Sequence, residues 1–112
     1  MALEATLHQI REAGALAVAV VSRDGTVLAA DLPAGVSRET FSIMCATIHG
    51  AGMTVSNEMR RSPPKRIALE SNEGCIVIRE AGRRALVVFV LPPGAEETRL
   101  DPFLETIARE TG

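Results

Sequence analysis

The stretch Ala17-Val18-Ala19-Val20-Val21-Ser22-Arg23-Asp24-Gly25-Thr26-Val27-Leu28-Ala29 decides the fold. Its apolar, valine-rich start predicts a strand over 15–21, because its length and β-branched residues favour a strand buried on both faces. Asp24-Gly25 predicts a tight turn, since both residue types tolerate positive φ. A second strand over 26–30 then returns antiparallel to the first.

Helical patterns flank this hairpin. Leu3, Leu7 and Ile10 recur at helical spacing and predict a first helix that ends near Gly14. A long helix is expected over 38–60, because Ser37 is a good N-cap and Pro63-Pro64 cannot continue a helix. Its expected core-facing residues are Phe41, Met44, Ile48, Ala51, Val55 and Met59. A last helix begins at Asp101 and Pro102.

Three further strands are expected over 65–71, 75–78 and 84–91, separated by short turns. The first, fourth and fifth strands do not alternate between apolar and polar residues, so both faces of the sheet must be covered. We therefore predict one α+β domain over 1–112, an α/β sandwich with a five-stranded antiparallel sheet. Its order is helix-β-β-helix-β-β-β-helix, with the long helix on one face and the terminal helices on the other.

Composition excludes several classes of function. A net charge of −2 gives no electrostatic footprint for nucleic acid, and three Phe with no Trp or Tyr leave little for base stacking. The apolar run Ala85 to Leu91, which is as long as any in the sequence, is too short to span a bilayer. Two cysteines and an N-terminus without a basic, apolar leader predict a cytoplasmic protein without membrane insertion.

The sequence offers no motif for chemistry. It contains neither glycine-rich phosphate-loop pattern, so we expect no nucleotide cofactor and no GTPase activity of its own. Cys45 and His49 share one helix face, as half of a zinc site or as a buried thiol beside a packed imidazole, and we prefer the second interpretation. Glu70, Glu73 and Glu80 are expected to be solvated. We predict no catalytic residue, no metal and no cofactor.

Four segments together resemble the roadblock (dynein light-chain 7) family. They are the stretch 17–29, the small residues Ala46-Thr47-Ile48-His49-Gly50-Ala51, and the later strands Ile67-Ala68-Leu69-Glu70-Ser71 and Gly74-Cys75-Ile76-Val77-Ile78. The resemblance implies homodimers or heterodimers that pair through the third strand and the long helix. It also implies, for prokaryotic members, binding of a Ras-like small GTPase and modulation of its nucleotide cycle. Eukaryotic relatives serve as dynein light chains or as scaffolds for GTPases.

The residues themselves also favour a homodimer. The apolar surface of the long helix is wider than one sheet face needs, and Gly50 and Gly52 each cost a helix interior about 1 kcal/mol relative to Ala. The third strand would leave apolar side chains at a sheet edge, where a partner strand could pair with it. The predicted dimer residues are Ile43, Ala46, Thr47, Gly50, Met53, Thr54, Ile67 and Leu69.

A cationic cluster follows the long helix, at Arg60, Arg61, Lys65 and Arg66. It either meets an acidic partner or complements the helix dipole in solvent, and the sequence leaves both open. We expect the GTPase contact at Asn57, Glu58, Arg60 and Arg61. The alternative functions are a passive scaffold or light-chain-like subunit of a larger complex, and a small-molecule sensory domain, which would need a polar cavity.

Overall fold

The apolar runs and turns fold into the predicted elements in the predicted order. The computed structural model describes residues 2–112. Over this range its elements are α1 Ala2–Glu12, β1 Ala17–Ser22, β2 Val27–Asp31, α2 Arg38–Glu58, β3 Arg66–Ser71, β4 Gly74–Ala81, β5 Ala85–Leu91, the 3₁₀-helix η1 Glu97–Leu100 and α3 Asp101–Thr111. The fourth strand is longer than predicted because Arg79 and Glu80 continue it and find ionic partners for their side chains.

The strands form one sheet in the order β2-β1-β5-β4-β3, with every neighbouring pair antiparallel. This confirms the predicted five-stranded antiparallel sheet. The turn between β1 and β2 places Gly25 at φ +94°, where a side chain would be strained. β2 and β3 are the outer strands, so each has one hydrogen-bonded neighbour within the chain.

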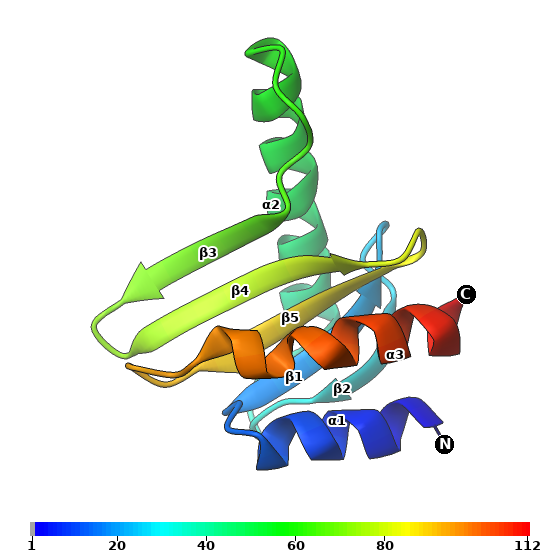
Figure 1. Ribbon diagram of the computed structural model, residues 1–112, viewed down its shortest axis with the longest axis vertical. Coiled ribbons are helices and arrows are strands. Elements are labelled where there is room, and N and C mark those ends of the chain that lie inside the picture. Colours follow the sequence, from blue (N-terminus) through cyan, green and yellow to red (C-terminus); the bar gives the residue numbers. More distant parts are fainter. Residues whose placement is uncertain (1) are drawn as a thin grey trace.

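Helices cover both faces of the sheet. α2 lies on one face, whereas α1 and α3 lie side by side on the other (Figure 1). β5 shows why its sequence does not alternate: Val87 and Phe89 enter the core beneath α1 and α3, and Leu86 and Val88 enter the core beneath α2. The structure therefore confirms the three-layer arrangement.

The predicted core-facing stripe of α2 is wrong. The residues of α2 that are buried are Ser42, Cys45, Ala46 and His49. Met44, Val55 and Met59 are 51%, 64% and 69% exposed, while Phe41 and Ile48 only flank the core. Small side chains allow the helix to lie close to the sheet. The positions of the large apolar side chains therefore did not indicate which face of α2 is buried.

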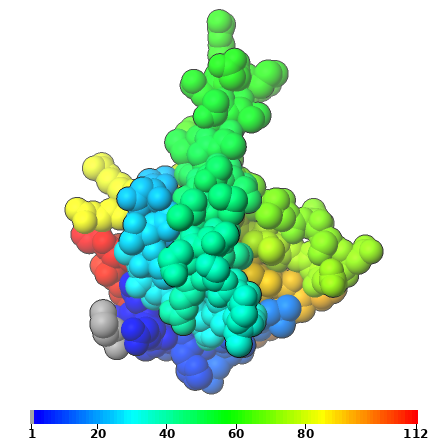
Figure 2. Space-filling view, turned by 180° about the vertical axis from the view of Figure 1, so that it is seen from behind, coloured from blue at the N-terminus to red at the C-terminus, as the bar shows by residue number. Residues whose placement is uncertain are grey.

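The second half of α2 projects beyond the sheet. Its last turns and the loop to β3 stand away from the other elements, as a ribbon in Figure 1 and as a prominent spur in Figure 2. The buried residues of α2 accordingly end at His49. Neither α2 nor any other helix within residues 2–112 combines the length and apolar character needed to cross a membrane.

Candidate partner-binding surface

A chain of three polar side chains fixes the first half of α2 to the sheet. His49 is 5% exposed, and its Nε2 lies 3.0 Å from Oε2 of Glu80 on β4. The same carboxylate oxygen accepts a hydrogen bond of 3.1 Å from Nη1 of Arg23. Arg23 also donates to the main-chain oxygens of Gly82 and Arg83, so it joins the β1–β2 turn to the β4–β5 turn.

Glu80 therefore differs from the solvated carboxylate that we expected. The hydrogen bond from Arg23 holds the pKa of Glu80 below its usual value, and the hydrogen bond from His49 adds to this effect while partial burial opposes it. Nothing in the local sequence pointed to this contact, because its three residues come from separate elements. Through its hydrogen bond to Glu80, the His49 side chain fixes α2 to the sheet.

Cys45 lies one turn before His49 and is buried. Burial raises the pKa of its thiol to about 11, which makes it a poor nucleophile and a poor metal ligand at neutral pH. Within residues 2–112, no three His, Cys, Asp or Glu side chains come together as metal ligands would. Cys45 and His49 thus pack in the core, as the preferred interpretation had it.

Besides its buried side, α2 presents an exposed face of small and apolar residues, which runs from Ile43 in its first half to Thr54 in its second half. We call Ile43, Thr47, Gly50, Met53 and Thr54 the exposed α2 face; all five are exposed. The Thr47 and Thr54 hydroxyls donate to the carbonyls of Ile43 and Gly50, at 2.7 and 3.1 Å. These bonds satisfy the hydroxyls within the helix, so the face needs no polar partner.

The two glycines of α2 differ in their surroundings. A Cβ on Gly50 would meet nothing within 4 Å, so no contact within the chain requires a glycine there. A Cβ on Gly52 would lie 2.7 Å from Cδ1 of Ile67, so Gly52 lets β3 approach the helix. Gly50 therefore carries the usual cost of a helical glycine without a compensating contact in this chain.

The end of α2 is closed by a Schellman motif. Arg61 N–H donates to Ser56 O at 2.8 Å and Arg60 N–H donates to Asn57 O at 3.0 Å. Arg60 occupies the left-handed position at φ +56°, where glycine is usual, and it is the one non-glycine residue in 2–112 with a positive φ. An arginine here costs stability and gains no ion pair within this range.

The predicted partner-binding residues lie at this projecting end, but they do not form one cluster. Asn57 and Arg61 border a hollow of about 310 Å³ with Met53, Thr54 and Pro63. Glu58 and Arg60 are exposed and lie outside its lining. The hollow thus joins part of the exposed α2 face to part of the predicted GTPase contact.

The predicted dimer residues also divide. Ala46 lies in the core between α2 and the sheet, so this residue is unavailable to a second chain, and its assignment to the dimer face was wrong. Ile67 is half-buried against the same core, and Leu69, two residues along the outer strand β3, is 43% exposed. The other five are the members of the exposed α2 face.

An antiparallel sheet between one long helix and two terminal helices defines a three-layer α+β domain. Residues 1–90 match the family model described as the Roadblock/LC7 domain. The chain therefore belongs to the Roadblock/LC7 domain family, in agreement with the resemblance noted from its sequence.

Individual relatives agree with this placement. The chain is 33% identical over 69 residues to the uncharacterized protein MJ0714 of Methanocaldococcus jannaschii, a match that spans 62% of this chain and 58% of that relative's length. The structure resembles the gliding protein MglB of Thermus thermophilus, with a TM-score of 0.83, 23% identity, and coverage of 99% of this chain and 90% of that one. An MglB structure described in a tetrameric arrangement also has a TM-score of 0.83 at 23% identity, covering 96% and 85%. At 23% identity, the similarity to the two MglB structures establishes the fold alone.

Proposed function

We propose that this protein is a non-catalytic, cytoplasmic homodimer that binds a Ras-like small GTPase and modulates its nucleotide cycle. The observation that carries the proposal is the projecting half of α2, whose face is small, apolar and open at Gly50. Membership in the Roadblock/LC7 family supports it, because the resemblance implies dimers and GTPase partners for prokaryotic members. The tetrameric arrangement of MglB supports self-association as a property of this fold.

In the proposed dimer, the exposed α2 faces of two chains pack together and the outer strands β3 pair. A two-fold axis pairs each residue i of one face with a residue j of the other, and only residues beside the axis meet their own copies. We place Gly50 beside the axis, where it allows the two helices a close approach. This recovers the cost of the helical glycine and covers Met53 and Ile43. Leu69 is covered by the neighbouring β3, which also removes an exposed sheet edge.

The GTPase contact is proposed at the projecting ends, through Asn57, Glu58, Arg60 and Arg61. Arg60 is the strongest of these, because a glycine in its place would be less strained. A residue kept against its backbone preference is expected to act on something outside the chain. Regulation then follows from differential binding: the dimer binds one arrangement of the GTPase switch loops more tightly and shifts the population toward it.

The dimer can be tested by size-exclusion chromatography with light scattering. We expect the wild-type chain, of 11.9 kDa, to elute with twice that mass at micromolar concentration. Gly50→Arg should give the mass of one chain, because it places two like charges at the closest approach of the helices. Gln9→Arg, on the exposed side of α1, is the matched control and should remain a dimer. A folded wild-type monomer would refute the proposal.

The GTPase contact can be tested with Arg60→Gly. This change relieves the left-handed strain and removes a guanidinium, so we expect unfolding free energy to rise by up to about 1 kcal/mol while GTPase binding weakens. A Ras-like GTPase encoded by the same genome, loaded with GDP or a GTP analogue, is the partner to use. If Arg60→Gly bound the GTPase more tightly than the wild-type chain while being more stable, the proposed contact at Arg60 would be wrong.

The same GTPase distinguishes regulation from scaffolding. A regulator binds one nucleotide state more tightly and changes the rate of hydrolysis or exchange, since differential affinity is what shifts the switch loops. A passive scaffold or light-chain-like subunit binds both states equally and changes neither rate. Equal binding to the two nucleotide states, with no change in either rate, would therefore favour the scaffold over the regulator.

A further inference from the structure

Two arginines face each other where β3 begins. Arg66, the first residue of β3, is directly opposite Arg79 of β4 in the strand register. Like charges placed directly opposite each other destabilise an antiparallel pair. None of the six residues of β3 is buried, and within residues 2–112 the only strand that neighbours it is β4. The start of β3 therefore needs another group to offset this repulsion.

Glu97 supplies that group from a distant part of the chain. It lies in η1, 31 positions after Arg66, and both of its carboxylate oxygens accept from Nε of Arg66, at 2.8 and 3.0 Å. The same carboxylate accepts from Nη1 of Arg79 at 3.0 Å. Asp101, at the start of α3, also accepts from Nη1 of Arg79, at 3.2 Å. Two carboxylates of the C-terminal segment thus neutralise two arginines of the sheet.

The position of this bridge makes it more than a surface ion pair. Glu97 and Arg79 are half-buried, whereas Arg66 is exposed. An isolated ion pair on a surface contributes little to stability, but several charges that form a network contribute more. The hydrogen bond to Glu97 also raises the pKa of Arg66 above its usual value, so the guanidinium stays charged beside its partner.

The bridge holds β3 from the face opposite α2. Ile67 packs against the core beneath α2, and Gly52 leaves room for its side chain. Because successive side chains of a strand point to opposite faces, Arg66 points to the side on which α3 lies (Figure 1). The start of β3 is therefore held from both faces, by α2 through Ile67 and by η1 through Glu97.

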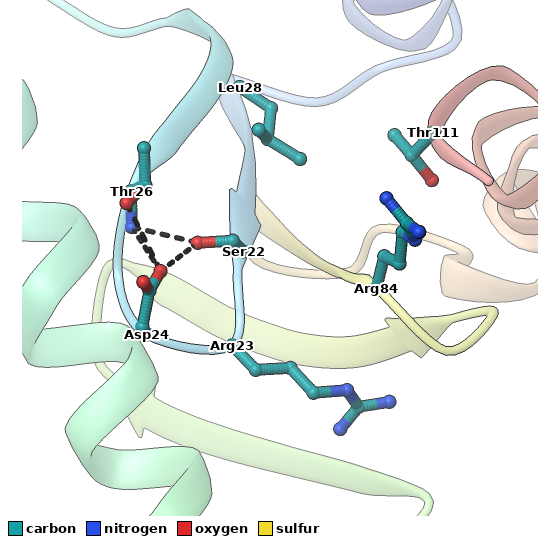
Figure 3. Close-up of a pocket in the computed structure, with 7 residues that line it drawn as sticks. All are labelled: Ser22, Arg23, Asp24, Thr26, Leu28, Arg84 and Thr111. Carbon is teal, nitrogen blue, oxygen red and sulfur yellow. Dashed lines mark hydrogen bonds between the residues drawn. The ribbon is translucent and has the colours of Figure 1, made fainter.

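The start of the other outer strand, β2, is held by contacts within its own turn. Asp24 accepts hydrogen bonds from the hydroxyl of Ser22 and from the main chain and hydroxyl of Thr26 (Figure 3). These bonds close the turn that joins β1 to β2, beside the hollow of about 630 Å³ drawn in Figure 3. By contrast, β3 follows the projecting end of α2, and a residue far along the chain holds its start.

We propose that Glu97 positions β3 for pairing with a second copy of this chain. This consequence rests on the dimer proposed above, in which the outer strands β3 pair. With Glu97 in place, the start of β3 stays paired with β4 and offers the partner a regular edge. Without it, repulsion between Arg66 and Arg79 loosens that end of the strand, and dimerisation weakens. Glu97 lies outside residues 1–90, which match the family model, so membership in the family does not predict this role.

The test is Glu97→Gln, which removes the charge and keeps the size of the side chain. Hydrogen exchange is read by peptide mass spectrometry at a concentration where variant and wild type have the same mass by light scattering. Exchange should accelerate at least about fivefold over 66–71 and stay within about twofold over 85–91, the central strand β5. Sedimentation equilibrium should show a dimer dissociation constant raised at least about fivefold. Glu105→Gln, the same change at an exposed position of α3, is the matched control and should alter neither quantity by more than about twofold.

A double variant shows whether the charge of Glu97 is responsible. Adding Arg66→Gln to Glu97→Gln removes the repulsion with Arg79, so exchange over 66–71 and the dissociation constant should both return toward their wild-type values. A residue that acted by packing alone would show no such recovery.

Three results would overturn the proposal: unchanged exchange over 66–71, equal acceleration over 85–91, or no recovery in the double variant. Faster exchange over 66–71 with an unchanged dissociation constant would overturn the link to dimerisation and leave the proposed dimer standing. A monomeric wild-type chain would refute the dimer and the pairing with it, while the exchange data would still decide whether Glu97 holds β3.

Discussion

The two halves of α2 are one continuous helix in two different environments. The first half, 38–49, buries Ser42, Cys45, Ala46 and His49 against the sheet. The second half, 50–58, projects from the body and leaves Val55 64% exposed (Figure 2). One face of the first half is therefore explained by contacts within the chain, whereas Ile43 and Met44 on its other side are 49% and 51% exposed. The second half has a glycine without a neighbour and an apolar surface without cover, and the proposed dimer would supply the molecule that covers it.

The largest expected effect is on unfolding free energy, when an aspartate is introduced into the buried half or the exposed half of α2. Ala46→Asp places a carboxylate in the core between α2 and the sheet, so we expect unfolding free energy to fall by at least about 3 kcal/mol. Ala51→Asp, the same change on the exposed part of the helix, has a similar helix-propensity cost and should lower it by less than about 1 kcal/mol. Urea unfolding followed by far-ultraviolet circular dichroism measures both, since the chain has no Trp or Tyr. Equal losses would show that the halves are equally packed.

The next effect is on the rate of thiol labelling, and it concerns only the first half of α2. Because the pKa of Cys45 is raised to about 11 from a usual value of 9.0, its thiolate at pH 8 is roughly one hundredfold scarcer than in the unfolded chain. Iodoacetamide labelling read by peptide mass spectrometry should therefore be at least one hundredfold slower at Cys45 in the native protein than in urea. Cys75, which is half-buried, is the internal comparison. Rapid native labelling of Cys45 would mean that this half of α2 readily leaves the sheet.

Sequence reasoning predicted the architecture because its signals are local. Asp24-Gly25 marks a turn, Ser37 and Pro63-Pro64 bracket α2, and the unbroken apolar run of β5 requires cover on both faces. It failed at the face of α2, where the bulky Met44, Val55 and Met59 form one periodic stripe and the small Cys45 and Ala46 form another. Periodicity alone favours the bulky stripe, but close packing on the sheet selected the small one.

The contact of His49 with Glu80 and Arg23 was beyond such reasoning for a different reason. Glu80 lies 31 positions from His49 and 57 positions from Arg23 along the chain. Their meeting depends on the register of β4 against β5 and of β5 against β1, which no local pattern specifies. The sequence shows that Arg60 is charged, but it does not show that Arg60 adopts a left-handed φ.

A smaller effect should distinguish the two glycines. Gly50→Ala should raise the unfolding free energy of the isolated protomer by about 0.5–1 kcal/mol, because its Cβ enters open space. Gly52→Ala should gain less, since its Cβ would displace the Ile67 side chain from 2.7 Å. Urea unfolding at decreasing protein concentration measures the protomer, and light scattering measures the dimer. If Gly50→Ala stabilised the protomer and strengthened the dimer as well, the close helix approach would be wrong.

The smallest effect concerns the carboxylate that holds the first half of α2 in place. The pKa of Glu80 is lowered mainly by the hydrogen bond from Arg23, so the unfolded state binds its proton more tightly than the folded state. The stability that Glu80 contributes is therefore present above its usual pKa of 4.5 and is lost as pH falls below it through the folded value. Because the side chain is 35% exposed, this contribution should be less than about 1 kcal/mol.

Glu80→Gln measures it in urea unfolding at pH 7 and at pH 3, followed by circular dichroism. The wild-type chain should be more stable than the variant at pH 7, and its advantage should be smaller at pH 3. Combining the change with Arg23→Gln should remove most of the difference at pH 7, because Arg23 is the largest cause of the shift. A difference of the same size at pH 3 as at pH 7, or one that survived the loss of Arg23, would mean that the glutamate acts through packing and not through its charge.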